Sequence, residues 1–564
     1  MKNRMKWYVL PVLLTGLLIM TSACSYEGLA AAEMGLQDGS LSAQAVSEDS
    51  DSLVPLEDAV SEDSDSPVLL AQSGDTPLTH LEVLMPFMPW SFDTRMAGHP
   101  SNDQVARLVF QNLFRLCYDT AMPVPELAAS WEFGDDTSVL NITVIGGAAF
   151  HNGDPLTAHD VAFTLTRLGQ TEWPEPFFEM VDHAVSHDDY NLTLYLRYPF
   201  APILHNLAHL SFGIIPMNHY LEVGTDYFAQ NPIGSGAFKF VDHIDDGLLR
   251  SILLARFDGY IGSLPVIESI TIRHGGFEPA DMFYEISSGT ADIAIDFPVI
   301  HPDELAEAYE DPNIFILRRP SAALDFIWLN TMQPYLDNPL VRRAIAYAID
   351  NEAILEQVYL GRGIITHTAL PTNAFGFVEM PPFTTNLDRA RELLTEAGLY
   401  PQGFETVIWY NIPNMQRRDI AEIVQQNLRQ LNIDVRIEAF EWGDYLTYSG
   451  EGLHHMLLLG WIVVTGEADY GLFSLFHSSR FGNDGNRAFF YNAELDYLLE
   501  TARAHPDLEV RRELYARALR IIHDEAPVVM LRQNEHIVAV SPRIGEFSLN
   551  PHGFHNFAVI GIVD

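Results

Sequence analysis

Apolar and polar positions alternate with strand-like and helix-like periods along most of the chain after about residue 80. β-Branched residues with partial alternation predict strands over 138–145, 192–196, 267–272 and 433–439, with a short strand and a loop over 81–90. Apolar residues at helical spacing predict helices over 105–117, 338–349, 351–359, 387–397 and 418–431. Helices interleaved with short strands indicate an α/β fold.

The starts of two helices are marked by capping residues. Asn338 stands before Pro339, which places a good capping side chain ahead of a proline in the first helical turn. In the run FHNGDPLTAHDVAFTL, residues 150–165, a turn leads into Thr157 and Asp160, which have the spacing of a capping box. By itself this run predicts an ordinary strand–turn–helix corner with no catalytic group.

The first 24 residues have the pattern of an export signal. Three positive residues precede residue 7, and the apolar segment 8–20 is shorter than the roughly 20 residues that cross a bilayer. Small residues then precede Cys24, as in a lipoprotein signal, although Thr21 stands where leucine is usual. We predict a signal peptide over 1–23 and a diacylated Cys24. The alternative is a plain secretory cleavage that leaves an N-terminal cysteine.

An acidic segment over 24–78 follows the signal. Between Ser25 and Asp75 there are 12 Asp or Glu residues and no Lys or Arg, and the octet AVSEDSDS occurs at 45–52 and again at 59–66. Such a segment cannot bury enough apolar surface to fold, so it predicts a disordered tether of roughly 40 Å. Two acyl chains would give stable membrane anchoring. The alternative is an acidic tail that binds a metal or a partner.

The charge of the chain excludes binding to nucleic acid through a basic patch. The formal net charge is −44, and about −35 remains without the signal and the acidic segment. After the signal, Lys239 is the only lysine, and arginine supplies the other positive charges. Arginine keeps its charge at a pH where lysine loses it, which favours an alkaline or saline medium. Codon bias is an equal alternative.

Only two cysteines are present, at positions 24 and 117. If Cys24 carries lipid, no disulfide can form within the chain. Cys117 lies in an apolar run, so we expect an inert buried thiol rather than a nucleophile.

The sequence offers no catalytic or cofactor motif. It contains no phosphate-binding loop with a lysine, no HExxH and no GxSxG. The 21 histidines are scattered, and the adjacent pair His454 and His455 leads into a predicted strand, where neighbouring side chains point to opposite faces. We therefore predict a protein that is not an enzyme and has neither a cofactor nor a metal site. An extracellular hydrolase would need a nucleophile and a base that we do not find.

Several motifs, in order, resemble those of the extracellular solute-binding proteins of ABC transporters of the peptide/nickel type, family 5. The run at 150–165 matches the signature F-x-[DN]-G-x-P-L-T-A-x-D-V of that family. Further matches are Pro125–Ala128 with Trp131, PIGSGAFKF (232–240), 256–260, Ser288–Gly289 with Asp292–Ile293, NPLVRRAIAYAID (338–350), EWGDYL (441–446), GWIVVTGEADYGLFSLF (460–476) and the helix 511–527. Together they extend from about residue 81 to the C-terminus.

This resemblance implies a large type II, two-lobe fold like that of periplasmic binding proteins, with an extra subdomain in the first lobe. The first lobe would comprise 79–328 and 530–564, its subdomain about 122–212, and the second lobe 329–529. Chain crossings near 321–330 and 531–537 would act as hinges. These boundaries come from the resemblance.

The resemblance also points to a ligand site between the lobes. In peptide carriers an Asp three residues after the Trp of a Gly-Trp segment holds the ammonium group of the ligand, and here that position is Val464. Dipeptide carriers place an Arg for the ligand carboxylate in a loop corresponding to about 410–417, where direct register gives Asn411, with Arg417 nearby. The segment 460–470 is instead similar to the branch that includes glutathione-binding proteins.

Candidate ligand-binding residues follow from these positions. Glu467 or Asp469 could supply a carboxylate for an ammonium group; alternatively, Asp469 caps the following helix and Glu467 faces solvent. Aromatic residues near the same segments could form apolar walls of the cleft or belong to the core. The full set is Trp409, Tyr410, Asn411, Arg417, Trp442, Trp461, Thr465, Glu467 and Asp469.

The function predicted from the sequence is a monomeric, lipid-anchored receptor of an ABC importer. It would capture a peptide or peptide-like small molecule by lobe closure and deliver it to a permease heterodimer with two ATPases. Its place would be the outer face of the cell membrane, or the periplasmic side if the cell has an outer membrane. The alternatives are a surface sensor or adhesive lipoprotein of the same fold, and a carrier of a non-peptide cargo such as a nickel chelate or an oligosaccharide.

Overall fold

The structure is a computed structural model. It describes residues 78–561 with breaks at 88, 90, 97–99, 118, 172–175, 246, 248–249, 296–299, 546, 548, 550 and 553–554. The expectations for the signal peptide, for Cys24 and for the acidic tether therefore lie outside the described residues, apart from position 78.

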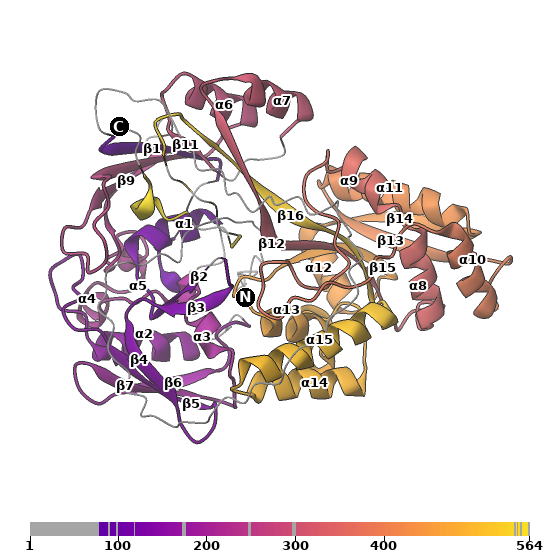
Figure 1. Cartoon of the computed structure of the whole chain (residues 1–564), viewed down its shortest axis with the longest axis horizontal. Helices are drawn as coiled ribbons and strands as arrows, with labels where there is room; N and C mark the ends of the chain where they lie inside the picture. Colours follow the sequence, from indigo (N-terminus) through magenta and orange to yellow (C-terminus); the bar gives the residue numbers. More distant parts are fainter. Residues whose placement is uncertain are drawn as a thin grey trace, which may run out of the picture.

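Two lobes lie side by side and are joined by two long strands, β12 and β16 (Figure 1). One ten-stranded sheet runs through both lobes in the order β14-β13-β15-β12-β16-β11-β1-β10-β9-β8. Its strands are β1 (His80–Met85), β8 (Phe238–Asp245), β9 (Arg250–Arg256), β10 (Ser269–His274), β11 (Ile293–Ala294), β12 (Phe315–Leu329), β13 (Phe404–Ile412), β14 (Ile433–Glu441), β15 (Met456–Ile462) and β16 (Val528–Val540). The mixed α/β class with two lobes is as predicted.

The β12–β16 pair belongs to both lobes. β16 pairs with β11 at its first-lobe end, and β12 pairs with β15 in the second lobe. Between these ends the antiparallel register shifts from Pro320 to Leu324, so residues 321–323 have no regular partner on β16. A second register shift separates Asp325 from Phe326, so the ribbon has regular pairing towards both ends and an irregular stretch between them. The crossings predicted at 321–330 and 531–537 fall on these two strands.

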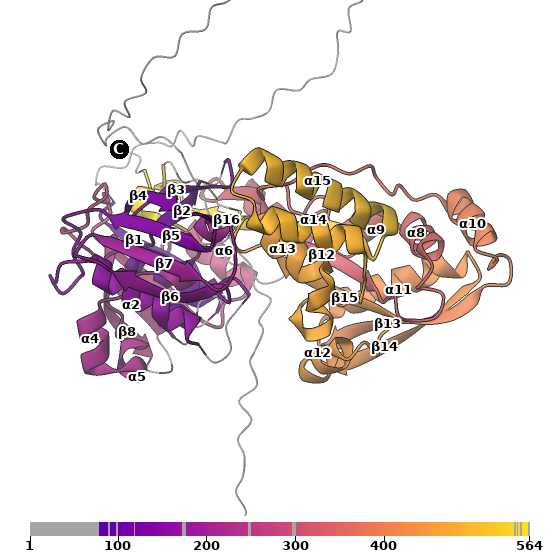
Figure 2. The same cartoon turned by 90° about the horizontal axis from the view of Figure 1, so that it is seen from below.

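The first lobe carries a separate four-stranded sheet with an antiparallel order β4-β5-β7-β6 (Figure 2). Its strands are β4 (Ala128–Phe133), β5 (Val139–Val144), β6 (Val181–Ser186) and β7 (Asn191–Leu196), and α2 (Ala158–Gly169), α3 (Ile203–Asn206) and the short turn η2 (Leu210–Phe212) lie with them. The remaining elements of this lobe are η1 (Thr94–Met96), α1 (Pro100–Val109), the hairpin β2 (Phe114–Cys117) and β3 (Met122–Pro125), α4 (Met217–Val223), α5 (Thr225–Phe228), α6 (Pro279–Ser287), α7 (Pro302–Glu310) and η5 (Phe557–Val559).

The second lobe is built on β13, β14 and β15, with helices on both sides of its sheet (Figure 1). Side chains alternate along β12, so that Phe326 and Trp328 join one core and Ile327 joins the other. The helices are α8 (Pro339–Ala348), α9 (Asn351–Gln357), α10 (Leu387–Glu396), α11 (Met415–Arg429), α12 (Trp442–Gly450), α13 (Ala468–Phe476), α14 (Ala493–Ala504) and α15 (Leu508–Glu525), with η3 (Ser478–Arg480) and η4 (Gly482–Asp484).

Most of the predicted elements are confirmed within a few residues. The side chain of Asn338 accepts a hydrogen bond from the backbone N–H of Leu340 at 2.9 Å and caps α8, as expected. Thr157 and Asp160 form the expected capping box at the start of α2, and the Thr157 N–H donates to Asp160 Oδ2 at 3.0 Å. Gly153 has a φ of +91° in the turn before it, which glycine adopts without strain.

The helix predicted over 105–117 is wrong in its second half. α1 ends at Val109, and residues 114–117 form strand β2. Asn112 explains the break, because its backbone N–H donates to Glu126 Oε2 at 2.9 Å rather than to the preceding helical turn. Its side-chain amide, also buried, donates to the His209 carbonyl at 2.6 Å. These bonds fix an extended chain where apolar spacing alone indicated a helix.

Cys117 is buried, with 2 % of its surface exposed, as expected. It is disulfide-bonded in the structure, however, so the expectation of a free thiol is wrong. No helix within the described part of the chain is both long enough and apolar enough to span a membrane.

Candidate ligand-binding site between the lobes

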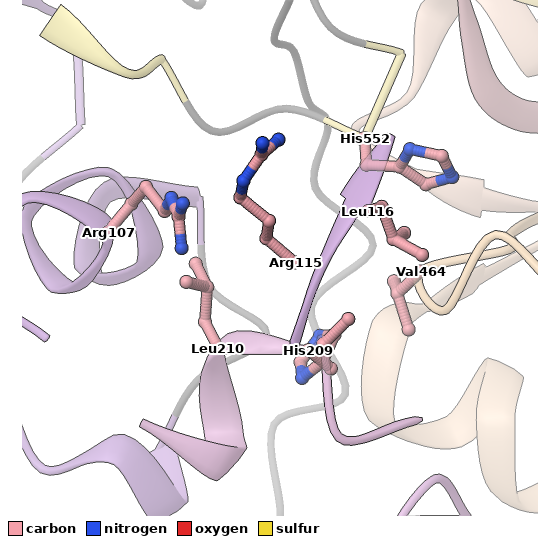
Figure 3. Close-up of a pocket in the computed structure, with 8 residues that line it drawn as sticks. Arg107, Arg115, Leu116, His209, Leu210, Val464 and His552 are labelled. Atoms are coloured by element: carbon pink, nitrogen blue, oxygen red, sulfur yellow. The ribbon is translucent and has the colours of Figure 1, made fainter. Parts of the chain in front are cut away.

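A small cavity of about 20 Å³ lies where the two lobes meet (Figure 3). Its volume suits one or two water molecules or a group of similar size. Side chains from both lobes and from the C-terminal segment line it: Arg107 on α1, Arg115 and Leu116 on β2, Ala208, His209 and Leu210 between α3 and η2, Val464 after β15, and His552. The cavity is therefore assembled only when these parts of the chain are brought together.

Two arginines give this cavity its charge. Arg107 Nη2 lies 3.4 Å from Glu126 Oε1, with 8 % of each side chain exposed, so its charge is balanced nearby. Arg115 is half-buried, and its side chain forms no hydrogen bond or ion pair with another residue in the described ranges. None of the eight lining residues is acidic. One positive charge thus remains without a balancing carboxylate at this seam.

The two histidines of the cavity are neutral near pH 7. Burial lowers the pKa of His209 to about 3, and nearby His552 lowers it further. Burial, followed by the charge of Arg319, lowers the pKa of His552 to about 3 as well. His209 Nδ1 accepts a hydrogen bond from the Ser211 N–H at 3.2 Å, so the proton of its neutral ring is on Nε2. Both rings therefore offer hydrogen bonds to a ligand without adding charge.

Gly466 shows how tightly the seam is packed. A Cβ at this position would stand 2.8 Å from Nε2 of His552 and 3.1 Å from Cδ1 of Leu116. Its φ of +66° is also one that other residues adopt only with strain. The approach of the second lobe to the first at this point therefore depends on the absence of a side chain.

Further contacts join the subdomain of the first lobe to the second lobe. The Ala201 N–H donates to the Arg503 carbonyl at 2.7 Å, and Thr137 Oγ1 donates to the Ala504 carbonyl at 3.0 Å. Arg480 forms an ion pair with Glu179. These bonds join residues more than 300 positions apart in the sequence. Because they connect the two lobes directly, the lobes are in a closed arrangement.

The predicted acidic candidates, Glu467 and Asp469, already have cationic partners. Glu467 is fully buried and paired with Arg511, and its side chain accepts from the Asp469 N–H to cap α13. Burial raises the pKa of Glu467 to about 7, and the Arg511 guanidinium opposes that rise. Asp469 accepts two hydrogen bonds of 2.9 Å from Arg503. The capping role considered for Asp469 belongs instead to Glu467, which does not face solvent.

Trp461 and Thr465 flank Val464 and carry polar atoms that lack a partner. The Trp461 ring centroid lies 5.3 Å from that of Tyr470. Trp461 Nε1 and Thr465 Oγ1 are buried and form no hydrogen bond to another described residue. Such atoms are uncommon in folded proteins, and here they lie in the segment that supplies Val464 to the cavity.

The other five candidates gather around the end of β13 and the start of α12. Trp409 Nε1 donates to Glu438 Oε2 at 3.1 Å, and Arg417 Nη1 donates to Asn411 Oδ1 at 2.5 Å. Trp409 and Asn411 are buried, whereas Tyr410, Arg417 and Trp442 are partly exposed. The Trp442 ring stacks on Tyr445 with centroids 6.0 Å apart. The structure therefore brings these five together, but the cavity lining includes none of them.

The sequence analysis missed Arg107, Arg115, His209 and His552. A signal was present at Arg115, the one charged residue in the apolar run LFRLC. Interpreting this run as a helix concealed that signal, because only a strand orients Arg115 opposite to both its neighbours. The two histidines gave no such signal, since they lie over 300 residues apart.

Comparison with known proteins agrees with this geometry. The family described as bacterial extracellular solute-binding proteins, family 5 Middle, matches residues 122–483, more than half of the chain. The chain belongs to this family. It is 26 % identical to a dipeptide-binding protein of Escherichia coli over 80 % of this chain and 89 % of that protein. A heme-binding protein A of Haemophilus influenzae is 28 % identical over 78 % and 84 % of the two chains.

Two further relatives extend the comparison. A glutathione-binding protein of Pectobacterium atrosepticum is 27 % identical over 83 % of this chain and 91 % of that one. Among solved structures, HbpA2 of Haemophilus parasuis superposes with a TM-score of 0.79 at 25 % identity, covering 86 % of this chain and 99 % of the other. The family 5 assignment and the two-lobe fold are thus confirmed. A family 5 solute-binding protein serves an ABC importer and binds peptides or related ligands.

Proposed function

We propose that this protein captures a peptide or peptide-like small molecule between its lobes and delivers it to an ABC permease heterodimer with two ATPases. The observation that carries this proposal is the cavity lined from both lobes, next to a two-stranded ribbon with an irregular point at 321–323. The similarity to dipeptide- and glutathione-binding proteins supports this class of ligand.

The mechanism is a reversible closure. The cavity of about 20 Å³ is too small for a whole peptide, since ligand sites usually enclose several hundred Å³. Entry therefore requires the lobes to separate, with bending concentrated at the register shift of β12. A ligand that contacts both lobes then favours the closed state by the difference in its affinity for the two states. No covalent step is needed.

Two measurements test this function. Native mass spectrometry of the protein as purified should show a bound small molecule, and its fragmentation identifies the cargo. A strain lacking the gene should lose uptake of that cargo and regain it on complementation. Unchanged uptake without the gene would contradict the import function and favour a surface sensor or adhesin of the same fold. A nickel chelate or an oligosaccharide in the spectrum would exclude the peptide class.

We also propose that the mature protein is held at the outer face of the membrane by lipid on Cys24. A diacylated Cys24 has no thiol left for a disulfide, and Cys117 is the only other cysteine of the chain. The anchor therefore excludes a disulfide within the chain, whereas the structure describes Cys117 as disulfide-bonded. Alkylation of the membrane-extracted protein without reductant, followed by intact mass measurement, decides between them. A diacyl mass and a labelled Cys117 support the anchor, whereas an unlabelled chain that reacts only after reduction contradicts it.

A further inference from the structure

We infer that Arg115 forms a carboxylate subsite, so that an anionic end of the cargo docks on the first lobe. This inference rests on the proposed capture of a peptide-like ligand and specifies how that ligand is oriented. The chain has a net charge of −44, yet none of the described residues that line the interlobe cavity is acidic. The cavity lining thus differs in charge from the acidic chain as a whole.

The charge balance at the cavity singles out Arg115. Arg107 has Glu126 at 3.4 Å, and Arg319 lies 3.3 Å from Asp119, so both nearby arginines have an acidic neighbour. Arg115 has no such neighbour among the described residues, although it is half-buried on β2. A partly buried guanidinium without a counter-charge is costly, and a ligand carboxylate would provide two parallel acceptors for it.

The second lobe contributes no competing charge. Val464 lines the cavity, and the two nearby carboxylates are held elsewhere, Glu467 by Arg511 and Asp469 by Arg503. An ammonium group placed here would meet Arg115 and no anion. The geometry therefore favours a carboxylate over an ammonium at this end of the ligand.

The size of the space fits one such group. About 20 Å³ accommodates a carboxylate but not a side chain of any length. Neutral His209 can donate from Nε2, which suits an anion without requiring protonation. The Trp461 indole N–H, near the end of β15, and the Thr465 hydroxyl, just after that strand, are buried and lack a hydrogen-bond partner among the described residues. They provide donors for the rest of the ligand.

The chemistry recognised is a carboxylate, which could be the C-terminus of a peptide or the side chain of an acidic residue. Three probes of one length separate these sources: a neutral tripeptide with a free C-terminus, the same tripeptide amidated, and an amidated tripeptide with one glutamate. A panel of such triplets is titrated by calorimetry against the full-length protein, its Arg115→Gln and Arg115→Lys variants, and a control. The control, Arg436→Gln, changes net charge equally at a side chain that is 75 % exposed in the second lobe.

For wild type we expect the free acid to bind roughly 10- to 100-fold more tightly than the amide, as a charge-assisted bidentate pair implies. Arg115→Gln should abolish this ratio, Arg115→Lys should restore part of it, and Arg436→Gln should leave it unchanged. If the amidated glutamate peptide binds as tightly as the free acid, the side chain is the docking group.

Other outcomes overturn the inference. Equal binding of acid and amide by wild type, or a ratio that survives in Arg115→Gln, refutes the subsite while leaving peptide capture intact. If wild type binds no member of the panel, the proposed peptide function fails, and the subsite fails with it. Should Arg115→Gln not fold, the acid-to-amide ratio of wild type and of Arg115→Lys still decides.

Discussion

Gly466 in the second lobe stands so close to His552 that a single added Cβ would lie 2.8 Å from the ring Nε2 of that histidine. The two residues are separated by the closing helices of the second lobe in sequence, and they meet only because the lobes are pressed together. The same Cβ would lie 3.1 Å from Leu116 on β2. A side chain at position 466 would therefore clash with the first lobe only when the lobes are closed.

Gly466→Ala should shift the protein towards an open arrangement. The new methyl group collides with residues across the seam only in the closed state, so the cost falls on closure more than on folding. Small-angle scattering should show a larger radius of gyration, and affinity for the cargo should fall. Gly398→Ala is the matched control, since its φ of +74° carries similar strain but no atom lies within 4 Å of its Cβ. Equal scattering curves for both variants would contradict the prediction.

Val464→Asp should weaken binding of acidic cargo. The new carboxylate would share the small cavity with Arg115 and would neutralise the charge that a ligand carboxylate needs. We expect a loss of roughly 10-fold or more in affinity for free-acid peptides, comparable to the loss of a charge-assisted hydrogen bond. Val464→Asn, of similar shape and no charge, should cause a smaller loss. If both variants bind alike, the charge of the cavity is not what selects the ligand.

Glu467→Gln should destabilise the second lobe. This carboxylate has 0 % exposure, and the change leaves Arg511 as a buried cation without its counter-charge. Removing one partner of a buried pair costs about 3–5 kcal/mol of unfolding free energy. Urea denaturation should show this loss, and the double variant Glu467→Gln with Arg511→Met should recover part of it. A single variant as stable as wild type would mean that the pair is not formed.

Stability should fall as the pH decreases from about 6.5 towards 5, because buried histidines must gain protons on unfolding. His209, His552 and His555 each have a pKa lowered to about 3 by burial. A folded pKa below the unfolded value of about 6.5 makes stability greatest above pH 6.5 and reduces it below. Each such histidine contributes a slope of about 1.4 kcal/mol per pH unit in this window.

His555→Phe tests this linkage at one site. The His555 ring stacks on Phe557 with centroids 5.8 Å apart, so an aromatic replacement keeps the packing and removes the proton. Denaturation curves at several pH values between 5 and 6.5 should give a slope smaller by about one proton than that of wild type. An unchanged slope would show that His555 does not take up a proton when the chain unfolds.

Local sequence signals specified the elements better than the site. The caps at Asn338 and Thr157 were predicted correctly, because a capping side chain acts on backbone groups two or three residues away. The run 105–117 was predicted wrongly, because Asn112 bonds to partners far away in sequence. Apolar spacing carries no information about such bonds.

The site depends on contacts between residues that lie far apart in the sequence. Val464 was recognised as a replaced anchor position, and the structure places it on the cavity. Arg115 and His552 reach the same cavity from chain segments more than 400 residues apart, which no local pattern can indicate. The aromatic candidates Trp409, Tyr410 and Trp442 are not among the residues that line that cavity. Their role as apolar walls of the cleft stays a prediction.

The unbroken course of β12 and β16 through both lobes has a spectroscopic consequence. Both strands are hydrogen-bonded on either side of the irregular stretch that begins at residue 321, so a bend there changes the backbone conformation of very few residues. The far-ultraviolet circular dichroism spectrum should therefore stay the same when cargo binds, because secondary structure is kept while the angle between the lobes changes. The indole of Trp461, partly buried near the junction, is the natural optical probe of the event.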